Sequence, residues 1–111
     1  MKHQMGLQNK WFDKIESGEK QYELRLFDEK RQKIHLGDTI EFSSKDGRKL
    51  TRKVVSLNIY PDFITLFAEM SNIVFLMLPG IESYQKALET MEEFYPVNKQ
   101  HKDGVVAIGL K

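Results

Sequence analysis

The chain has no cysteine among its 111 residues, only three prolines and no long apolar run. Without cysteine there is no disulfide framework, no thiolate nucleophile and no cysteine-ligated metal. The apolar stretch Ile73–Leu78 is far shorter than the ~20 residues that cross a bilayer. Met1–Trp11 lacks the apolar run of a signal peptide. We therefore expect a protein of the reducing cytoplasm with no membrane segment.

An excess of one charge sign is also missing. Seventeen Lys and Arg residues face 16 Asp and Glu residues, which leaves a formal net charge of +1. Any nucleic acid must therefore bind at a local basic patch, with modest and salt-sensitive affinity. The hydrophobic content of 41% is typical of a globular protein. The length predicts a single domain over residues 1–111.

Hydrophobic periodicity and turn signals predict an α+β fold with a mixed sheet or small barrel. A helix should begin at Asn9 as its N-cap and end at Gly18, and a second long helix should begin at Ser83 and end before Pro96. A hairpin turn is expected at Asp46-Gly47. Strands are predicted over Lys2–Leu7, Gln21–Leu26, Thr39–Phe42, Leu50–Tyr60 and Gly104–Leu110, and a further helix over Asp62–Met70.

The apolar residues of these elements form the expected core. Trp11, Phe12 and Ile15 share one face of the first helix, where Trp11 serves as core or barrel lid rather than as a stacking platform. In the long strand Leu50–Tyr60, the residues expected inside are Val54, Val55, Leu57 and Ile59. We predict that one core contains Tyr22, Leu24, Val55, Leu57, Val106 and Ile108.

One face of the strand Gln21–Leu26 is polar and carries side chains suited to binding or catalysis. Glu23 and Arg25 point to the same side, and Lys20 stands at its mouth beside Gly18. A guanidinium suits a phosphate or a base edge, and a carboxylate can accept from an exocyclic amine such as that of cytosine. The alternative interpretation is a solvated strand with an exposed ion pair, which contributes about 0–1 kcal/mol.

Three segments in series carry a family resemblance. They are the G-x-K-x-x-E-x-R pattern of Gly18–Arg25, the I-x-x-G-D-x-I-x-F pattern of Ile34–Phe42, and Tyr95-Pro96 followed by Gly104–Ile108. In this order they resemble the ASCH domain family of PUA-like small β-barrels, over about Met5 to Leu110. The resemblance implies a mixed barrel of about five or six strands flanked by short helices. It also implies a cleft lined by the G-x-K-x-x-E-x-R strand and action on RNA.

The resemblance further implies a choice of activities. One bacterial branch of the family hydrolyses N4-acetylcytidine with a Lys, a Thr and a Glu, and a ribonuclease activity is attributed to another branch. The Lys falls at Lys20. The Thr falls at Glu23, a departure from the pattern. The Glu lies in a segment of variable length, for which Glu69 and Glu82 are candidates. The hydrolase mechanism therefore does not carry over intact.

These residues support three hypotheses of different classes. In a binding module for RNA or a nucleoside, Lys20 and Arg25 contact phosphate or carbonyl oxygens, Glu23 contacts a base amine, and Tyr95 stacks on a base or closes the core. In a small metal-independent hydrolase, Lys20 is the general base or electrophilic stabiliser and Glu23 an acid or base. In a protein-interaction domain, the apolar segment Ile73–Leu78 is the contact surface.

The remaining charged and metal-ligating residues show no site of their own. The basic clusters Lys30–Lys33 and Arg48–Lys53 are either solvated loops or local patches for phosphates. His3, His35 and His101 are scattered without the spacing of metal ligands. We therefore expect neither a metal nor a cofactor.

Overall fold

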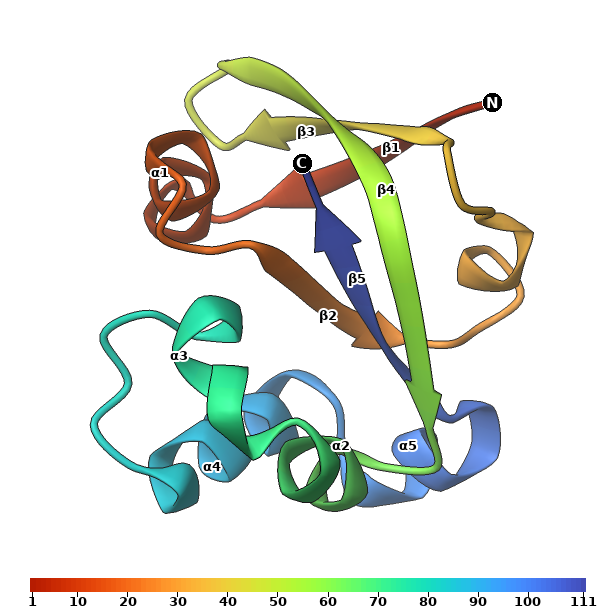
Figure 1. The fold of residues 1–111 in the computed structure, drawn as a ribbon, viewed down its shortest axis with the longest axis vertical. Helices are drawn as coiled ribbons and strands as arrows, with labels where there is room; N and C mark the ends of the chain where they lie inside the picture. Colours follow the sequence, from red (N-terminus) through yellow and green to blue (C-terminus); the bar gives the residue numbers. More distant parts are fainter.

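Five strands form one curled sheet in the order β1-β3-β4-β5-β2 in the computed structural model, which describes residues 1–111 (Figure 1). β1 and β3 run parallel, and every other neighbouring pair is antiparallel. The predicted α+β fold with a mixed, barrel-like sheet is therefore confirmed. The strands are β1 (Lys2–Leu7), β2 (Tyr22–Leu26), β3 (Thr39–Ser44), β4 (Lys49–Tyr60) and β5 (Val105–Leu110).

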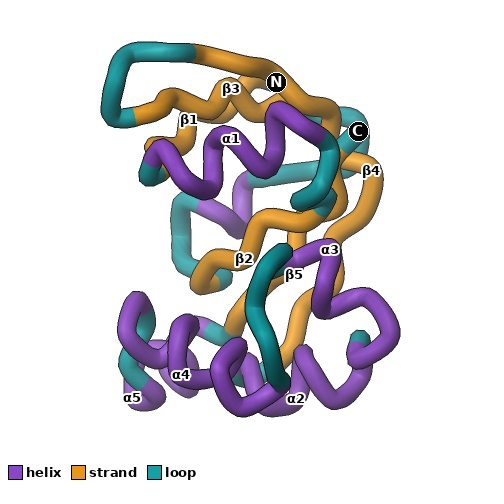
Figure 2. The backbone as a smooth tube through the Cα atoms, turned by 90° about the vertical axis from the view of Figure 1, so that its left-hand side faces the viewer, coloured by secondary structure: helices purple, strands orange, loops and turns teal.

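The helices gather mainly at one end of the sheet. Figures 1 and 2 show α2, α4 and α5 together at that end, whereas α1 lies beside β1 and β3 at the other, and β4 runs between the two ends. The helices are α1 (Asn9–Ser17), α2 (Phe63–Glu69), α3 (Val74–Met77), α4 (Tyr84–Phe94) and α5 (Val97–Asp103), with 3-10 turns at Arg31–Lys33 and Ser71–Ile73. None of these helices has both the length and the apolar character required to span a bilayer.

Capping side chains explain where α2 and α4 begin. The Asp62 side chain accepts a hydrogen bond from the Thr65 amide at 2.8 Å and starts α2. The Ser83 hydroxyl accepts one from the Lys86 amide at 3.1 Å and starts α4, as predicted. The prediction for α1 is wrong by one residue, because Gln8 is its N-cap.

Asn9, the expected cap of α1, has a different task. Its Oδ1 atom accepts hydrogen bonds from the amides of Lys45 and Asp46 at 2.9 and 3.3 Å. The first residue of α1 is thereby tied to the β3–β4 turn. In that turn Gly47 has a φ of 91°, which only glycine adopts without strain, so the Asp-Gly hairpin signal is confirmed.

Two apolar cores flank β5, whose residues are all buried. Val106, Ile108 and Leu110 face an inner core that α1 closes with Phe12 and Ile15. The alternate residues of β5 face an outer core beneath the helices, composed of Trp11, Leu24, Phe63, Leu66, Phe67, Met77, Leu78, Ala87, Met91, Val105 and Ala107.

The prediction of a single core for six residues is wrong, because helices cover the sheet on the far side of β5 and β2. Leu57 packs against the inner core with Val106 and Ile108, whereas Leu24 belongs to the outer core and Tyr22 packs against it. Val55 and Ile59 are 47% and 51% exposed. Successive residues of a strand point to opposite faces, and the register shifts between Val54 and Ser56, so Val55 points away from the core that holds Val54.

Candidate functional site

Lys20 is held in place by the end of α1. Gly18 adopts a φ of 87° at the helix C-cap and turns the chain toward β2. The Lys20 amide then donates to the Lys14 carbonyl at 2.9 Å, and the Gln21 amide donates to the Leu76 carbonyl at 2.7 Å. As a result the Lys20 side chain points inward. Its Nζ atom donates to the carbonyl oxygen of Met77, and only 4% of the residue is exposed.

Glu23 is buried as deeply as Lys20. It is 5% exposed, with one carboxylate oxygen 3.5 Å from Lys20 Nζ and the other accepting from Arg25 Nε at 2.7 Å. The three side chains thus form a continuous cation–anion–cation row. The interpretation of this strand as a solvated face with an exposed ion pair is therefore wrong, because the curl of the sheet and the helix α3 cover it.

Arg25 ends the row and spans the gap between two strands. Its Nη2 atom donates to the carbonyl oxygen of Gly6 at 2.9 Å. Since β1 and β2 are the two outer strands of the sheet order, this bond joins the opposite edges of the curled sheet. Two nitrogens of Arg25 donate hydrogen bonds to protein groups, which leaves fewer donors for a ligand.

Burial and proximity shift the proton affinity of this row. Burial lowers the pKa of the Lys20 ammonium, although the Glu23 carboxylate works in the opposite direction. Burial also disfavours the charged form of Arg25, but its neighbour Glu23 outweighs this effect and the pKa of the guanidinium is raised. Arg25 is therefore a permanent cation, whereas Lys20 is the cation that loses its proton more readily than an ordinary lysine.

A cavity of about 430 Å³ opens beside the row, between the ends of β1 and β3, the strand β2, and the helices α1 and α4. This volume lies within the range of small-molecule sites. Its lining contains Lys20, Glu23 and Arg25 together. The other lining residues are Gly6, Leu7, Gln8, Trp11, Leu24, Ser43, Ser44, Lys45, Leu78, Met91, Phe94 and Tyr95.

Aromatic side chains contribute to the cavity wall. Trp11 is 8% exposed and belongs to the outer core, with Lys20 Nζ 5.5 Å from its ring centroid. The Tyr95 ring lies 6.1 Å from that of Phe63, so this residue closes the core and lines the cavity at once. Burial raises the pKa of its phenol. Phe94 is 47% exposed at the cavity and presents an unburied ring surface.

Several lining residues escaped sequence reasoning. Phe94 is the last residue of α4, where no motif distinguishes it from the apolar residues that face the core. Ser43, Ser44 and Lys45 come from the end of β3, and Gln8 precedes α1; neither segment contains a motif. The two candidate carboxylates Glu69 and Glu82 are exposed and line no part of the cavity. The only carboxylate in the lining is that of Glu23.

The histidines lie away from this cavity. His3 Nε2 is 2.8 Å from Asp38 Oδ2, and His101 Nε2 is 3.3 Å from Asp62 Oδ2. No group of three or more His, Cys, Asp or Glu side chains is arranged to hold a metal ion. The chemistry available in the cavity is therefore that of an amine, a carboxylate, a guanidinium, two serine hydroxyls and aromatic rings.

Comparisons with known proteins identify the fold. The model of the ASCH domain family matches residues 5–111. The crystal structure of hypothetical protein PH0355 is 37% identical with a TM-score of 0.88, over 100% of this chain and 98% of that one. The solution NMR structure of protein PF0455 from Pyrococcus furiosus is 33% identical with a TM-score of 0.78, over 100% and 96%.

A more distant structure shares the fold alone. The crystal structure of ASCH from Zymomonas mobilis is 16% identical with a TM-score of 0.64, over 99% of this chain and 66% of that one. A search of curated proteins found no match. The comparisons therefore show a family and a fold, and they carry no statement of activity.

Proposed function

The chain belongs to the ASCH domain family, and from this premise we propose that its cavity binds a nucleoside, either free or as one unit of an RNA strand. The observation that carries the proposal is the buried row Lys20–Glu23–Arg25 in the wall of a 430 Å³ cavity that also holds aromatic side chains. A nucleoside combines a flat apolar face with a polar edge, and this cavity offers a complement to each.

The polar end of the cavity suits the edge of a base. An ammonium has three donors, of which Lys20 gives one to the Met77 carbonyl. The Glu23 oxygen that faces Lys20 is 3.5 Å from its Nζ atom, whereas the other oxygen is bound by Arg25. A donor and an acceptor thus stand side by side. Glu23 would accept from an exocyclic amine, as a carboxylate accepts from cytosine N4, and Lys20 would donate to the neighbouring ring nitrogen or carbonyl.

The apolar part of the cavity suits the face of a base. Phe94 has half of its surface free, and Leu78 and Met91 are nearby in the same lining. Tyr95 is already packed on Phe63 and Phe94, with ring centroids 6.1 and 6.3 Å apart. We therefore assign the stacking contact to Phe94 first, with Tyr95 supporting it from behind.

Binding of cytidine and uridine, measured by calorimetry or by NMR titration, tests the proposal. Phe94→Ala should lower the affinity by about tenfold or more, because base–aromatic stacking contributes about 1–3 kcal/mol. Its thermal midpoint should stay near that of the wild type, because the ring is half exposed. Glu23→Gln removes the negative charge from the cavity wall, and Glu69→Gln, which removes one outside the cavity, is its matched control. Absence of saturable nucleoside binding by the folded protein would refute the proposal.

One observation favours hydrolysis as a second function. Burial lowers the pKa of Lys20, so the neutral amine forms more readily than in an ordinary lysine, and a neutral amine can activate water as a general base. The ammonium formed on Lys20 would then return this proton to the leaving amine of an N4-acetylcytidine-type amide, directly or by relay through the Glu23 carboxylate, with acetate as the other product. Turnover of N4-acetylcytidine should disappear in Lys20→Met and should rise with pH in the wild type. Turnover that survives in Lys20→Met would exclude this role.

A further inference from the structure

The strands β1, β3 and β4 leave one face of the sheet without a covering helix. Met5 and Leu7 point into the inner core, whereas the alternate residues Lys2 and Gln4 are exposed. The same alternation holds along the first half of β4, where three exposed residues, Lys49, Thr51 and Lys53, occupy alternate positions. This outer face, defined by Lys2, Lys49, Lys53 and the residues between them, is polar throughout.

The register of the strands arranges these residues in three rows. One row is Lys2–Thr39–Lys53, the next is Gln4–Glu41–Thr51, and the third is Gly6–Ser43–Lys49. At ordinary strand spacings the Cα atoms of Lys2 and Lys53 lie about 10 Å apart, and those of Lys49 and Lys53 about 13 Å apart. The lysines therefore mark three corners of an open area on the outside of the curled sheet.

The charge of the outer face is positive although that of the chain is nearly balanced. Glu41 is the only acidic residue in the three rows, with its carboxylate oxygens 3.1 Å from Lys2 Nζ and 4.0 Å from Lys49 Nζ. Three lysines against one glutamate leave two positive charges on this area. A chain with a net charge of +1 thus places a disproportionate share of its positive charge on one face.

The structure divides the basic cluster Arg48–Lys53 that the sequence contains. Arg48 is occupied by acids, with Nη1 2.7 Å from Asp13 Oδ1 and Nε 3.0 Å from Asp46 Oδ1. Arg52 lies on the opposite face of β4 from Lys49 and Lys53. Its guanidinium donates to the Thr51 carbonyl at 3.1 Å. The lysines of the cluster, and not its arginines, lie on the outer face together with Lys2.

The outer face is continuous with the cavity. Gly6 and Ser43, which share a row with Lys49, also line the cavity, as does the exposed Lys45 that follows β3. The row Gly6–Ser43–Lys49 therefore borders the cavity on β1 and β3 and carries the first lysine of the outer face on β4. A chain that leaves the cavity past Ser43 meets Lys49 next.

We infer that the outer face holds the backbone of a single-stranded RNA, one nucleoside of which occupies the cavity. The inference rests on the proposed function of the cavity and extends it from a nucleoside to a strand. Phosphates would pair with Lys45 and Lys49 near the cavity, and with Lys53 or Lys2 farther along. Lysine suits this task as a point charge on a flexible stem, and such contacts carry no sequence information.

Binding of cytidine monophosphate and of an octamer of oligocytidine RNA, each over a range of salt concentrations, tests the inference. At low salt the octamer should bind at least tenfold more tightly than cytidine monophosphate. In Lys49→Ala/Lys53→Ala the slope of log K against log salt for the octamer should fall by about 1.4, since each phosphate contact on a single strand contributes about 0.7. Binding of cytidine monophosphate should not change.

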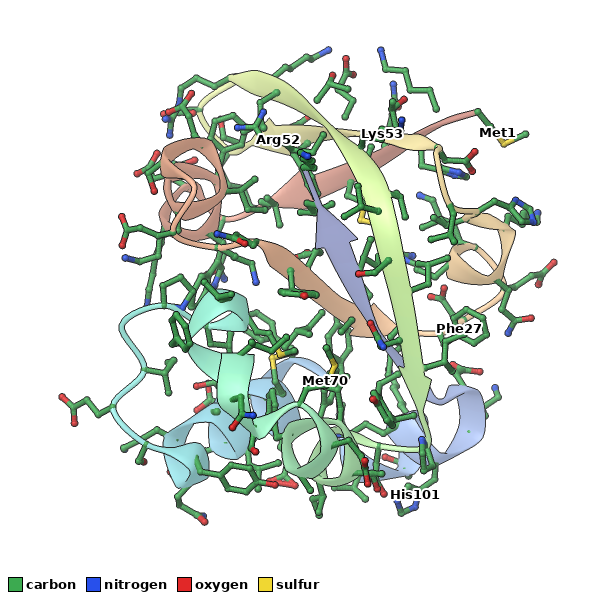
Figure 3. All side chains as sticks on the ribbon, viewed as in Figure 1. Met1, Phe27, Arg52, Lys53, Met70 and His101 are labelled. Atoms are coloured by element: carbon green, nitrogen blue, oxygen red, sulfur yellow. The ribbon has the colours of Figure 1, made fainter.

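The matched control is Lys99→Ala/Lys102→Ala. It removes the same charge from two exposed lysines of α5. Figure 3 shows His101 of α5 at the end of the molecule opposite to Lys53. An equal fall in slope for the control, or an octamer that binds no better than cytidine monophosphate, would overturn the inference and leave the proposed function standing. If neither cytidine, cytidine monophosphate nor the octamer binds, the proposed function fails and the inference with it.

Discussion

The Arg25 guanidinium donates a hydrogen bond of 2.9 Å to the carbonyl oxygen of Gly6 and so connects β2 to β1. These strands are the two ends of the sheet order. The same guanidinium holds Glu23 through its Nε atom at 2.7 Å. A single side chain therefore joins the sheet edges at the border of the cavity and neutralises the carboxylate in its wall.

Arg25→Met should destabilise the fold by about 2–4 kcal/mol, because it leaves a buried carboxylate with one cation and an unpaired edge carbonyl. Urea unfolding measures the change. Lys53→Met, at an exposed site, should stay within about 0.5 kcal/mol of the wild type. The double variant Glu23→Gln/Arg25→Met should cost less than the sum of its single changes. An Arg25→Met protein that unfolds at the wild-type midpoint would show that the bridge is not structural.

The stability of the protein should depend on pH through Lys20. Its folded pKa lies below the ordinary 10.5, so between the two values the unfolded chain binds more protons than the folded one. The free energy of unfolding therefore rises with pH in that interval and levels off above 10.5. The wild type should gain stability relative to Lys20→Met as pH rises toward 10.5. Tyr95, with a raised pKa, is common to both proteins. If the difference in unfolding free energy between the wild type and Lys20→Met does not change with pH, the burial of Lys20 is contradicted.

Leu24 and Val55 allow a core position to be compared with a surface position. Leu24→Ala should cost about 2–5 kcal/mol, because the residue is 4% exposed within the outer core. Val55→Ala should cost less than about 0.5 kcal/mol, because Val55 is 47% exposed. Chemical denaturation of both variants compares them directly. Equal losses would mean that Val55 lies in a core after all.

Gln100 is a buried connector between α2 and the cavity wall. Its Oε1 atom accepts from the Phe63 amide at 3.0 Å, and its Nε2 atom donates to the Tyr95 carbonyl at 2.8 Å. Gln100→Leu leaves both backbone groups unpaired and should cost about 2–4 kcal/mol. Gln85→Leu, at an exposed position of α4, is the control and should unfold like the wild type in a thermal melt. A Gln100→Leu protein as stable as this control would contradict the assignment.

Local signals were sufficient to predict most elements. Three signals each depend on a few neighbouring residues: the helix stop at Gly18, the cap at Ser83 and the Asp-Gly hairpin. They can therefore be predicted from the sequence without knowledge of the fold. The helix α5 was missed because Val97–Asp103 is almost entirely polar and has no apolar period. Gln100 of this helix bonds the Phe63 amide, 37 residues away in the sequence, and the nearby Tyr95 carbonyl; the first of these contacts exists only in the folded chain.

The sequence by itself determined the family, the strand alternation and the placement of Glu23 and Arg25 on one face, because each follows from residue order and the period of a strand. Only the tertiary structure decided that this face is buried. Lys20 meets the carbonyl of Met77, and Arg25 meets that of Gly6, across long separations in the chain. The packing of α3 beside β2 creates the first contact and the curl of the sheet creates the second. Both depend on how the strands and helices pack together, which no local pattern encodes.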